Sequence, residues 1–287
     1  MEGEMFLRTP TKQLNNLTLL DRFLFASVME DKRSLELALS IIMGEEVSLR
    51  QPGEVEKEFR TMPWLRSIRL DVYSADDKNR IYDAEVQKRN TGGLAKRSRF
   101  YQALIDSTLL PPGEGMNFHP LPESFLIMIT PFDLWGRGRY RYTFKMRCEE
   151  EPDLYLNDGI TRIFLNTRGT NDGEVSQELA ELLHYIEDSS DEMARTCSSE
   201  KVQELHRRVS EVKASEEYGV KYMQAWEEKL YERMDGKAEG LAEGMALAQY
   251  LLKAKRYDDL ERAVRDPAYR DELCRELDLQ KAAAANE

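Results

Sequence analysis

The chain has few of the residues that several common kinds of active site require. It contains three histidines in 287 residues, and these lack the spacing of metal ligands: His119, His184 and His206. No Ser-His or Cys-His arrangement for nucleophilic catalysis is evident, and neither a P-loop nor a glycine-rich dinucleotide fingerprint is present. These absences argue against a small-molecule hydrolase and against a nucleotide-binding fold.

Cysteine and long apolar segments are also scarce. The three cysteines are far apart and odd in number, which predicts neither a disulfide framework nor a zinc site: Cys148, Cys197 and Cys274. No apolar run reaches the ~18 to 20 residues that cross a bilayer, and the first residues, MEGEMFLRTPTKQ, lack the basic and apolar regions of a signal peptide. We therefore expect a cytoplasmic protein with no membrane partner.

Positive charge is in the minority but is concentrated. The net charge of −12 argues against a surface coated with cations for nucleic acid. However, residues 86–105 and residues 136–148 each contain five basic residues and no acid. In the second stretch the cations from Arg137 to Arg147 alternate with Tyr140, Tyr142, Phe144 and Met146, as in a strand with one cationic face. Such a face either pairs with the abundant acids or contacts phosphates, and both alternatives are open.

The central feature is a predicted β-hairpin over residues 68–90. Apolar and polar residues alternate over 68–73 and over 82–87, with a turn at 76–79. A period of two places Asp71 on the polar face of the first strand, and Asp83, Glu85 and Gln87 on one face of the second. If the polar faces coincide, the carboxylates converge and repel one another unless a cation lies between them. Hard oxygen ligands of this kind suit magnesium or manganese.

An Asp followed at some distance by Glu-x-Gln resembles the core motif of the PD-(D/E)XK nuclease superfamily. The closer resemblance is to its recombination-promoting nuclease (Rpn-like) and putative transposase branch, where Gln commonly replaces the motif Lys. Further similar segments follow in order: RSRFYQALID at 97–106, SFLIMITPF at 124–132, YRYTF at 140–144 and the Ala-Glu-Gly repeats near residue 240. The resemblance covers most of the chain.

This resemblance implies a divalent-metal-dependent DNA endonuclease that hydrolyses phosphodiester bonds with Mg²⁺ or Mn²⁺. Asp71 and Glu85 match the two metal-binding acids, the carbonyl of Val86 is a further ligand, and Gln87 occupies the position of the motif Lys. A Gln cannot supply positive charge, although its amide can hold a water or a phosphate oxygen.

Cations from the following helix are therefore candidates for stabilising charge in the transition state. Lys96, Arg97 and Arg99 fit this role better than Lys88, which lies on the opposite strand face by parity. The predicted DNA contacts are Lys88, Lys96, Arg97, Arg99, Tyr101 and Gln102.

Two alternatives stay open. Asp71 and Glu85 can be ordinary exposed acids on a hairpin, and the fold can be a catalytically inactive DNA-binding or protein-interaction module that works through long C-terminal helices. Asp21, Glu30 and Glu36, on two helices predicted over 17–43, could add an acid to the site, but a solvated helix face is the favoured interpretation.

The order of elements predicts an α/β fold. A helix from residue 94 to about 110 separates the hairpin from the continuous apolar run FLIMIT, as in a crossover between strands, and GITRIFLN at 159–166 reads as a last strand. Together with the resemblance, this predicts a restriction-endonuclease-like core, a central mixed β-sheet flanked by helices, over residues 1–190. An α-helical extension is predicted over 191–287, ending in two short helices separated near Pro267.

The extension contains glycine at every fourth residue, at Gly236, Gly240 and Gly244. Such spacing lines one helix face and permits close approach of another helix, which would support homo-oligomerisation through the C-terminal helices. A frayed, low-complexity linker is the alternative, and both stay open.

Overall fold

The computed structural model describes residues 14–59, 68–109 and 117–284, with side chains as far as residue 277. The chain forms two compact units, Met1–Tyr222 and Met223–Glu287. The first unit thus includes residues 191–222, and the predicted domain boundary near residue 190 stays a prediction.

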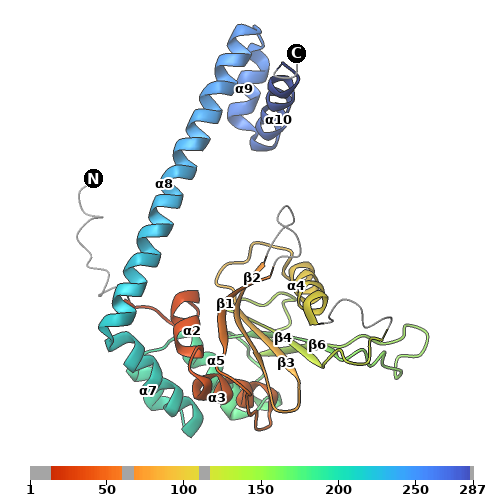
Figure 1. Cartoon of the computed structure of the whole chain (residues 1–287), viewed down its shortest axis with the longest axis vertical. Helices are drawn as coiled ribbons and strands as arrows, with labels where there is room; N and C mark the ends of the chain where they lie inside the picture. Colours follow the sequence, from red (N-terminus) through yellow and green to blue (C-terminus); the bar gives the residue numbers. More distant parts are fainter. Residues whose placement is uncertain (1–13, 60–67, 110–116, 285–287) are drawn as a thin grey trace. The chain divides into compact units, whose positions relative to one another are not determined.

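Within the described residues, the first unit is built on a six-stranded mixed sheet in the order β1-β2-β3-β4-β6-β5 (Figure 1). The strand β2 (Ile68–Ala75) is antiparallel to both of its neighbours, β1 (Glu54–Phe59) and β3 (Ile81–Val86). The strands β3, β4 (Ser124–Thr130) and β6 (Ile160–Asn166) are parallel, and β5 (Arg141–Phe144) is antiparallel to β6. The predicted fold class, a mixed sheet flanked by helices, is confirmed.

The predicted hairpin is the β2–β3 pair, and its turn is held by one side chain. Asp76 Oδ1 accepts hydrogen bonds from the backbone N–H groups of Lys78 (3.0 Å) and Arg80 (2.8 Å). Asn79 adopts a left-handed φ of 64°, which asparagine tolerates better than most residues. The turn at 76–79 is therefore fixed locally, and it sets the register of the two strands that carry the candidate acids.

Helices cover both faces of the sheet (Figure 1). One face packs against α2 (Arg22–Met29), α3 (Lys32–Met43), α5 (Gln177–Glu187) and α7 (Glu200–Ala214), and the short α6 (Asp191–Thr196) adds to that layer. The other face packs against α4 (Leu94–Leu109). In β4, Ile127 and Ile129 join the first core while Leu126 and Met128 join the second, so this strand is buried on both sides as its apolar run predicts.

The crossover from β3 to the parallel strand β4 contains α4. Gly92 and Gly93, just before the helix, have φ angles of +75° and +67°, which are strained for any residue with a Cβ atom. This turn reverses the chain so that the first turn of α4 lies beside the end of β3, and side chains from α4 can reach the hairpin acids.

The N-terminal segment forms the two predicted helices, although the first begins at Arg22, later than the predicted residue 17. Asp21 and Asp31 cap α2 and α3 by accepting hydrogen bonds from the backbone N–H groups of Phe23 and Ser34, and α3 ends at Gly44 in the left-handed conformation. The cap at Asp21 orients the first residue of α2, Arg22, which matters for the site.

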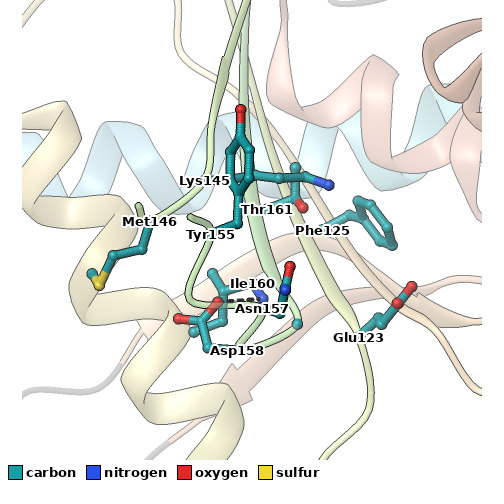
Figure 2. A pocket seen from close by; sticks show the side chains of 10 residues that line it. Glu123, Phe125, Lys145, Met146, Tyr155, Asn157, Asp158, Ile160 and Thr161 are labelled. Atoms are coloured by element: carbon teal, nitrogen blue, oxygen red, sulfur yellow. Dashed lines mark hydrogen bonds between the residues drawn. The ribbon is translucent and has the colours of Figure 1, made fainter. Parts of the chain in front are cut away.

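A small cavity of about 130 Å³ lies where β4 and β6 begin (Figure 2). Lys145, Tyr155 and Asp158 are among the residues that line it. It shares no residue with the segment 68–90, although Phe125 in its lining stacks on Tyr82 of β3.

The second unit continues α8 (Glu216–Lys253), which begins in the first, and adds α9 (Tyr257–Arg265) and α10 (Pro267–Ala284). The two short helices separated near Pro267 are confirmed. Their small core is formed by Leu247, Leu251, Ala263, Leu273 and Leu277. In the part of the chain that the structure describes, no helix is long and apolar enough to cross a membrane.

Candidate active site

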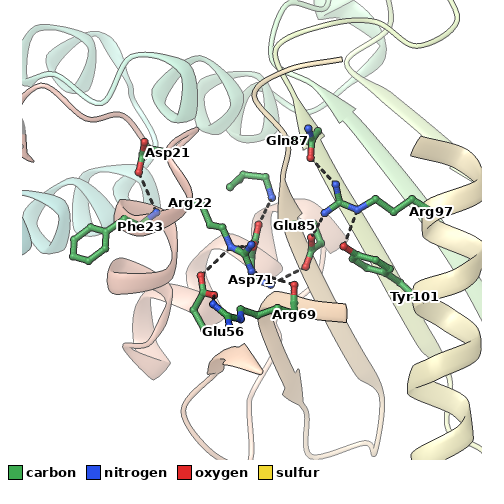
Figure 3. Close-up of polar contacts among 11 residues, drawn as sticks. Asp21, Arg22, Phe23, Glu56, Arg69, Asp71, Glu85, Gln87, Arg97 and Tyr101 are labelled. Carbon is green, nitrogen blue, oxygen red and sulfur yellow. Dashed lines mark hydrogen bonds and ion pairs between the residues drawn. The ribbon is translucent and has the colours of Figure 1, made fainter. Parts of the chain in front are cut away.

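Asp71 of β2 and Glu85 of β3 lie next to each other where the two strands part (Figure 3). The antiparallel register runs from Ala75 opposite Ile81 to Val72 opposite Ala84, so Asp71 and Glu85 form the next position. There the carboxylates replace the backbone acceptors. Glu85 Oε1 accepts a hydrogen bond from the Asp71 N–H (2.7 Å), and Asp71 Oδ2 accepts one from the Val86 N–H (3.0 Å).

Two arginines from different helices complete the contacts of the pair. The Nε atom of Arg22, on α2, forms an ion pair with Asp71 Oδ1 (2.5 Å) and with Glu56 (2.9 Å). Arg97, on α4, donates through Nη2 to Glu85 Oε2 (3.1 Å). Each of the four carboxylate oxygens of Asp71 and Glu85 thus contacts a backbone amide or a guanidinium group.

Arg97 also connects the acids to Gln87. Its Nη1 donates to Gln87 Oε1 (2.7 Å), and its Nε donates to the hydroxyl of Tyr101 (2.7 Å). Two of the three predicted catalytic residues, Glu85 and Gln87, therefore share the Arg97 guanidinium group, and the third, Asp71, lies next to Glu85 (Figure 3). The structure buries both acids, with exposed fractions of 2% and 1%, so they are not ordinary exposed acids.

Burial changes the acid–base chemistry of the pair. Loss of solvent is the main cause that raises the pKa of Asp71 to about 6, and Arg22 opposes it. Burial, followed by the neighbouring Asp71, raises the pKa of Glu85 to about 8, and Arg97 opposes it only in part. The two carboxylates therefore resist being charged at the same time, which is the condition that a divalent cation relieves.

A third acid, Asp83, lies two residues before Glu85 on the same strand face. It is 1% exposed, and neither of its carboxylate oxygens has a hydrogen-bond partner among the described residues. Burial, together with Glu85 and Asp71, raises the pKa of Asp83 well above its usual value. Asp83 thus adds a third buried carboxyl group next to the pair, and its surroundings disfavour its charged form.

The chemistry of the donor set fits a magnesium or manganese ion. No group of three or more His, Cys, Asp and Glu side chains within residues 14–59, 68–109 and 117–284 is arranged to hold a metal ion. Mg²⁺, however, commonly binds through one or two carboxylates and keeps several waters. Asp71 and Glu85 offer two buried hard oxygen donors that repel each other, and Arg22 and Arg97 supply the positive charge that such an ion would supply.

The predicted DNA contacts fall into two groups. Lys88, Lys96 and Arg99 are exposed, and none of them forms an ion pair with an acid among the described residues. Arg97 and Tyr101 face the acids, as described above.

Gln102 is buried, and its amide group donates to Asp106 (2.8 Å) and to Ser124 (2.9 Å). This position favours a role in holding α4 against β4, and its contact with DNA stays a prediction.

The early-helix acids do not supply a ligand, but an adjacent cation reaches the site. Asp21 caps α2, Glu30 is the C-terminal cap of α2, and Glu36 accepts a hydrogen bond from the Leu49 N–H. Arg22 was not among the predicted site residues, because only the acids of this segment are candidate metal ligands. A basic residue directly after an Asp that can cap a helix is the signal that points to it.

The predicted cationic strand is shorter than its alternation suggests, since β5 covers only Arg141–Phe144. Arg139 pairs with Glu174, and Arg141 donates through Nη1 to the carbonyl of Ile42 (2.7 Å). Lys145 and Arg147 form no ion pair within the described residues. Pairing with an acid therefore holds for Arg139, while contact of the other cations with phosphate stays a prediction.

Residues 55–238, more than half of the chain, match the family model described as PD-(D/E)XK nuclease family transposase. The matched region begins in β1 and contains the hairpin and α4. No curated protein and no solved structure gives a significant match.

Proposed function

The chain belongs to the PD-(D/E)XK nuclease family transposases, and we propose that it is a divalent-metal-dependent DNA endonuclease that hydrolyses phosphodiester bonds. Membership in the family implies a nuclease-type hydrolase with DNA as substrate. The observation that carries the proposal is the buried pair of Asp71 and Glu85, whose side chains converge where β2 and β3 separate.

Asp71, Glu85 and the carbonyl of Val86 would hold Mg²⁺ or Mn²⁺. When bound there, the ion would polarise the scissile phosphate and lower the pKa of a bound water. The protein's own part is to keep the two carboxylates buried and fixed, so that their charges act in a site with little competing solvent.

Gln87 and Arg97 would act on the substrate side of the acids. The Gln87 amide can orient a water or a phosphate oxygen, because it carries both a donor and an acceptor. Arg97 already contacts Gln87 and Glu85, so its guanidinium group lies where the motif Lys would place positive charge. We assign to Arg97 the stabilisation of negative charge that develops on the phosphate.

One observation favours the alternative of a catalytically inactive DNA-binding or protein-interaction module. All four carboxylate oxygens of Asp71 and Glu85 have partners within the chain. Because each of these oxygens already has a partner, the two acids can stay in place without a metal ion. The same arrangement could therefore persist in a protein that does not cleave DNA.

The test is nicking and linearisation of supercoiled plasmid by the purified protein, with Mg²⁺ or Mn²⁺ and with EDTA. Asp71→Asn and Glu85→Gln are preferable to alanine because each retains an oxygen that can accept the backbone hydrogen bond. We expect either change to lower metal-dependent cleavage by about 100-fold or more. Asp77→Asn is the matched control, because Asp77 is an exposed acid in the turn of the same hairpin.

Cleavage that survives both site substitutions would mean that the active site lies elsewhere or that the activity comes from a contaminant. A folded wild type that binds DNA but does not cut it under any metal condition would support the inactive module.

A further inference from the structure

A cavity of about 640 Å³ lies directly beside the carboxylate pair. Its volume is within the range of about 300 to 1,000 Å³ that is typical of small-ligand sites. Residues from α2, β2 and α4 line it, among them Arg22, Arg69, Lys96, Arg97, Phe100 and Tyr101. Arg22 and Arg97 are the arginines that contact Asp71 and Glu85, so the cavity adjoins the candidate active site (Figure 3).

The side chains that line the cavity include four cations and no acid. This contrasts with the net charge of −12 for the whole chain. Lys96 is exposed and forms no ion pair in the described part of the chain, so its ammonium group is available to an incoming anion. Arg22, Arg69 and Arg97 form ion pairs with carboxylates outside the lining, so Lys96 is the lining cation that is unpaired among the described residues, and an unpaired cation in a concave surface attracts a phosphate group.

Phe100 distinguishes this cavity from a site for phosphate alone. Its side chain is 39% exposed, it belongs to neither core cluster of the first unit, and it stacks on no other ring among the described residues. Phe100 follows Lys96 by four residues on α4, so the two side chains lie on one helix face. An exposed ring beside cations is the arrangement with which proteins hold unpaired bases.

We propose that this cavity binds one unpaired nucleotide of the DNA substrate, with its phosphate beside Lys96 and Arg69 and its base stacked on Phe100. Bases of a regular duplex are stacked on one another, so Phe100 can reach the face of a base only where that base is unpaired or turned out. The preferred substrate is therefore DNA with an unpaired nucleotide next to the cut. This inference rests on the proposed nuclease function, whose site the cavity adjoins.

The test is a binding measurement by fluorescence anisotropy in EDTA, where no cleavage is expected. Three labelled oligonucleotides are compared: a perfect duplex, the same duplex with one bulged nucleotide, and the single strand. We expect the full-length wild type to bind the bulged duplex about tenfold more tightly than the perfect duplex. Phe100→Leu, which keeps apolar bulk but removes the ring, should abolish this preference and change affinity for the perfect duplex by less than about twofold.

Two variants act as controls, and thermal unfolding verifies that each is folded. Phe100→Tyr keeps a ring and should keep the preference. Phe118→Leu makes the same change at another exposed phenylalanine, outside the cavity, and should leave both affinities unchanged.

Equal affinity of the wild type for bulged and perfect duplexes would overturn the inference, as would an equal loss for both in Phe100→Leu. If the wild type cuts plasmid without any such preference, only the inference fails. If it prefers the bulged duplex but never cuts DNA, the nucleotide site holds and the proposed nuclease function fails.

Discussion

At the scale of single residues, the two buried carboxylates of the site are bound by groups of the protein with which a metal ion would compete. Backbone amides take one oxygen of each acid, and Arg22 and Arg97 take the other. A metal ion would have to share or displace the guanidinium groups. The Arg22 side chain is 39% exposed, so its guanidinium group can turn toward solvent and make room for an ion that takes over its contact with the buried Asp71 carboxylate.

Replacing Arg22 should strengthen metal binding. Without its guanidinium group, Asp71 Oδ1 is open to a cation, and we expect Arg22→Met to raise Mn²⁺ affinity by about two- to fivefold at pH 8.5. The high pH is needed because Arg22 lowers the pKa of Asp71, and its removal would favour proton competition at lower pH. Isothermal titration calorimetry measures the affinity, with Arg69→Met as the control in the same cavity. Weaker binding in Arg22→Met would mean that Arg22 positions Asp71 for the metal.

The raised pKa of Glu85 makes stability depend on pH. The folded state holds the Glu85 proton up to a pKa of about 8, whereas the ordinary value is 4.5. The resulting stabilisation is complete below pH 4.5 and is lost as the pH rises through 8, and Asp71 adds a similar loss up to about pH 6. In EDTA, the free energy of unfolding of the wild type should therefore fall relative to that of Glu85→Gln between pH 5 and pH 8.5.

Urea unfolding at several pH values measures this difference, with Asp77→Asn as a variant that should follow the wild type. Addition of Mn²⁺ at pH 8 should raise the stability of the wild type more than that of Glu85→Gln, because the ion binds only the folded state. Parallel pH curves for the wild type and Glu85→Gln would show that Glu85 is not protonated in the folded protein.

At the scale of elements, α8 carries an apolar stripe that is exposed among the described residues. Tyr231, Met234, Leu241, Met245 and Leu252 are each more than half exposed, and with Ala238 and Ala248 they recur at alternating intervals of three and four residues. That spacing is the seam of a coiled coil. A Cβ atom added at Gly236, Gly240 or Gly244 would meet nothing within 4 Å, so no described residue uses the close approach that these glycines permit.

The stripe makes the predicted homo-oligomerisation testable. If α8 pairs with a second copy, Leu241→Lys with Met245→Lys should convert an oligomer to a monomer, because two buried cations would face each other across the seam. Size-exclusion chromatography with light scattering measures the mass. The control is Glu239→Lys with Glu243→Lys, on the same helix outside the stripe. A wild type that is monomeric at about 100 μM, well above a micromolar dissociation constant, would reject this seam.

At the scale of the whole molecule, the sequence predicts elements better than it predicts contacts. The hairpin, the crossover helix and the buried strand β4 follow from local periodicity and glycine placement, and all three are present. The polar face expected for β2 is absent, because Asp71 and Tyr73 are buried along with Leu70 and Val72. Alternation alone cannot reveal that helices will cover both faces of the sheet.

The candidate site likewise contains residues that local sequence predicts and residues that only the tertiary packing brings in. Asp71, Glu85 and Gln87 could be placed together because they lie on one hairpin, and Arg97 because it follows closely in the chain. Arg22 is 49 positions before Asp71, and its role depends on how α2 packs against β1 and β2, which no local pattern encodes. The hydrogen bonds from the Asp71 and Val86 amides to the carboxylates could not be predicted from the sequence either, because they form only where the two strands separate.

Those two hydrogen bonds affect which substitutions can accumulate at positions 71 and 85 in a gene copy that is no longer selected for DNA cleavage. Because each carboxylate also accepts a backbone hydrogen bond, a substitution that removes both of its oxygens, such as one to alanine, leaves a buried N–H group unsatisfied at a cost of about 1 to 3 kcal/mol. Domains are only marginally stable, so selection for folding alone would eliminate many such mutations. A copy under no selection for DNA cleavage would therefore tend to keep an oxygen-bearing side chain at positions 71 and 85, either the acid or its amide, and a dormant lineage would remain a few substitutions away from the original pair of acids.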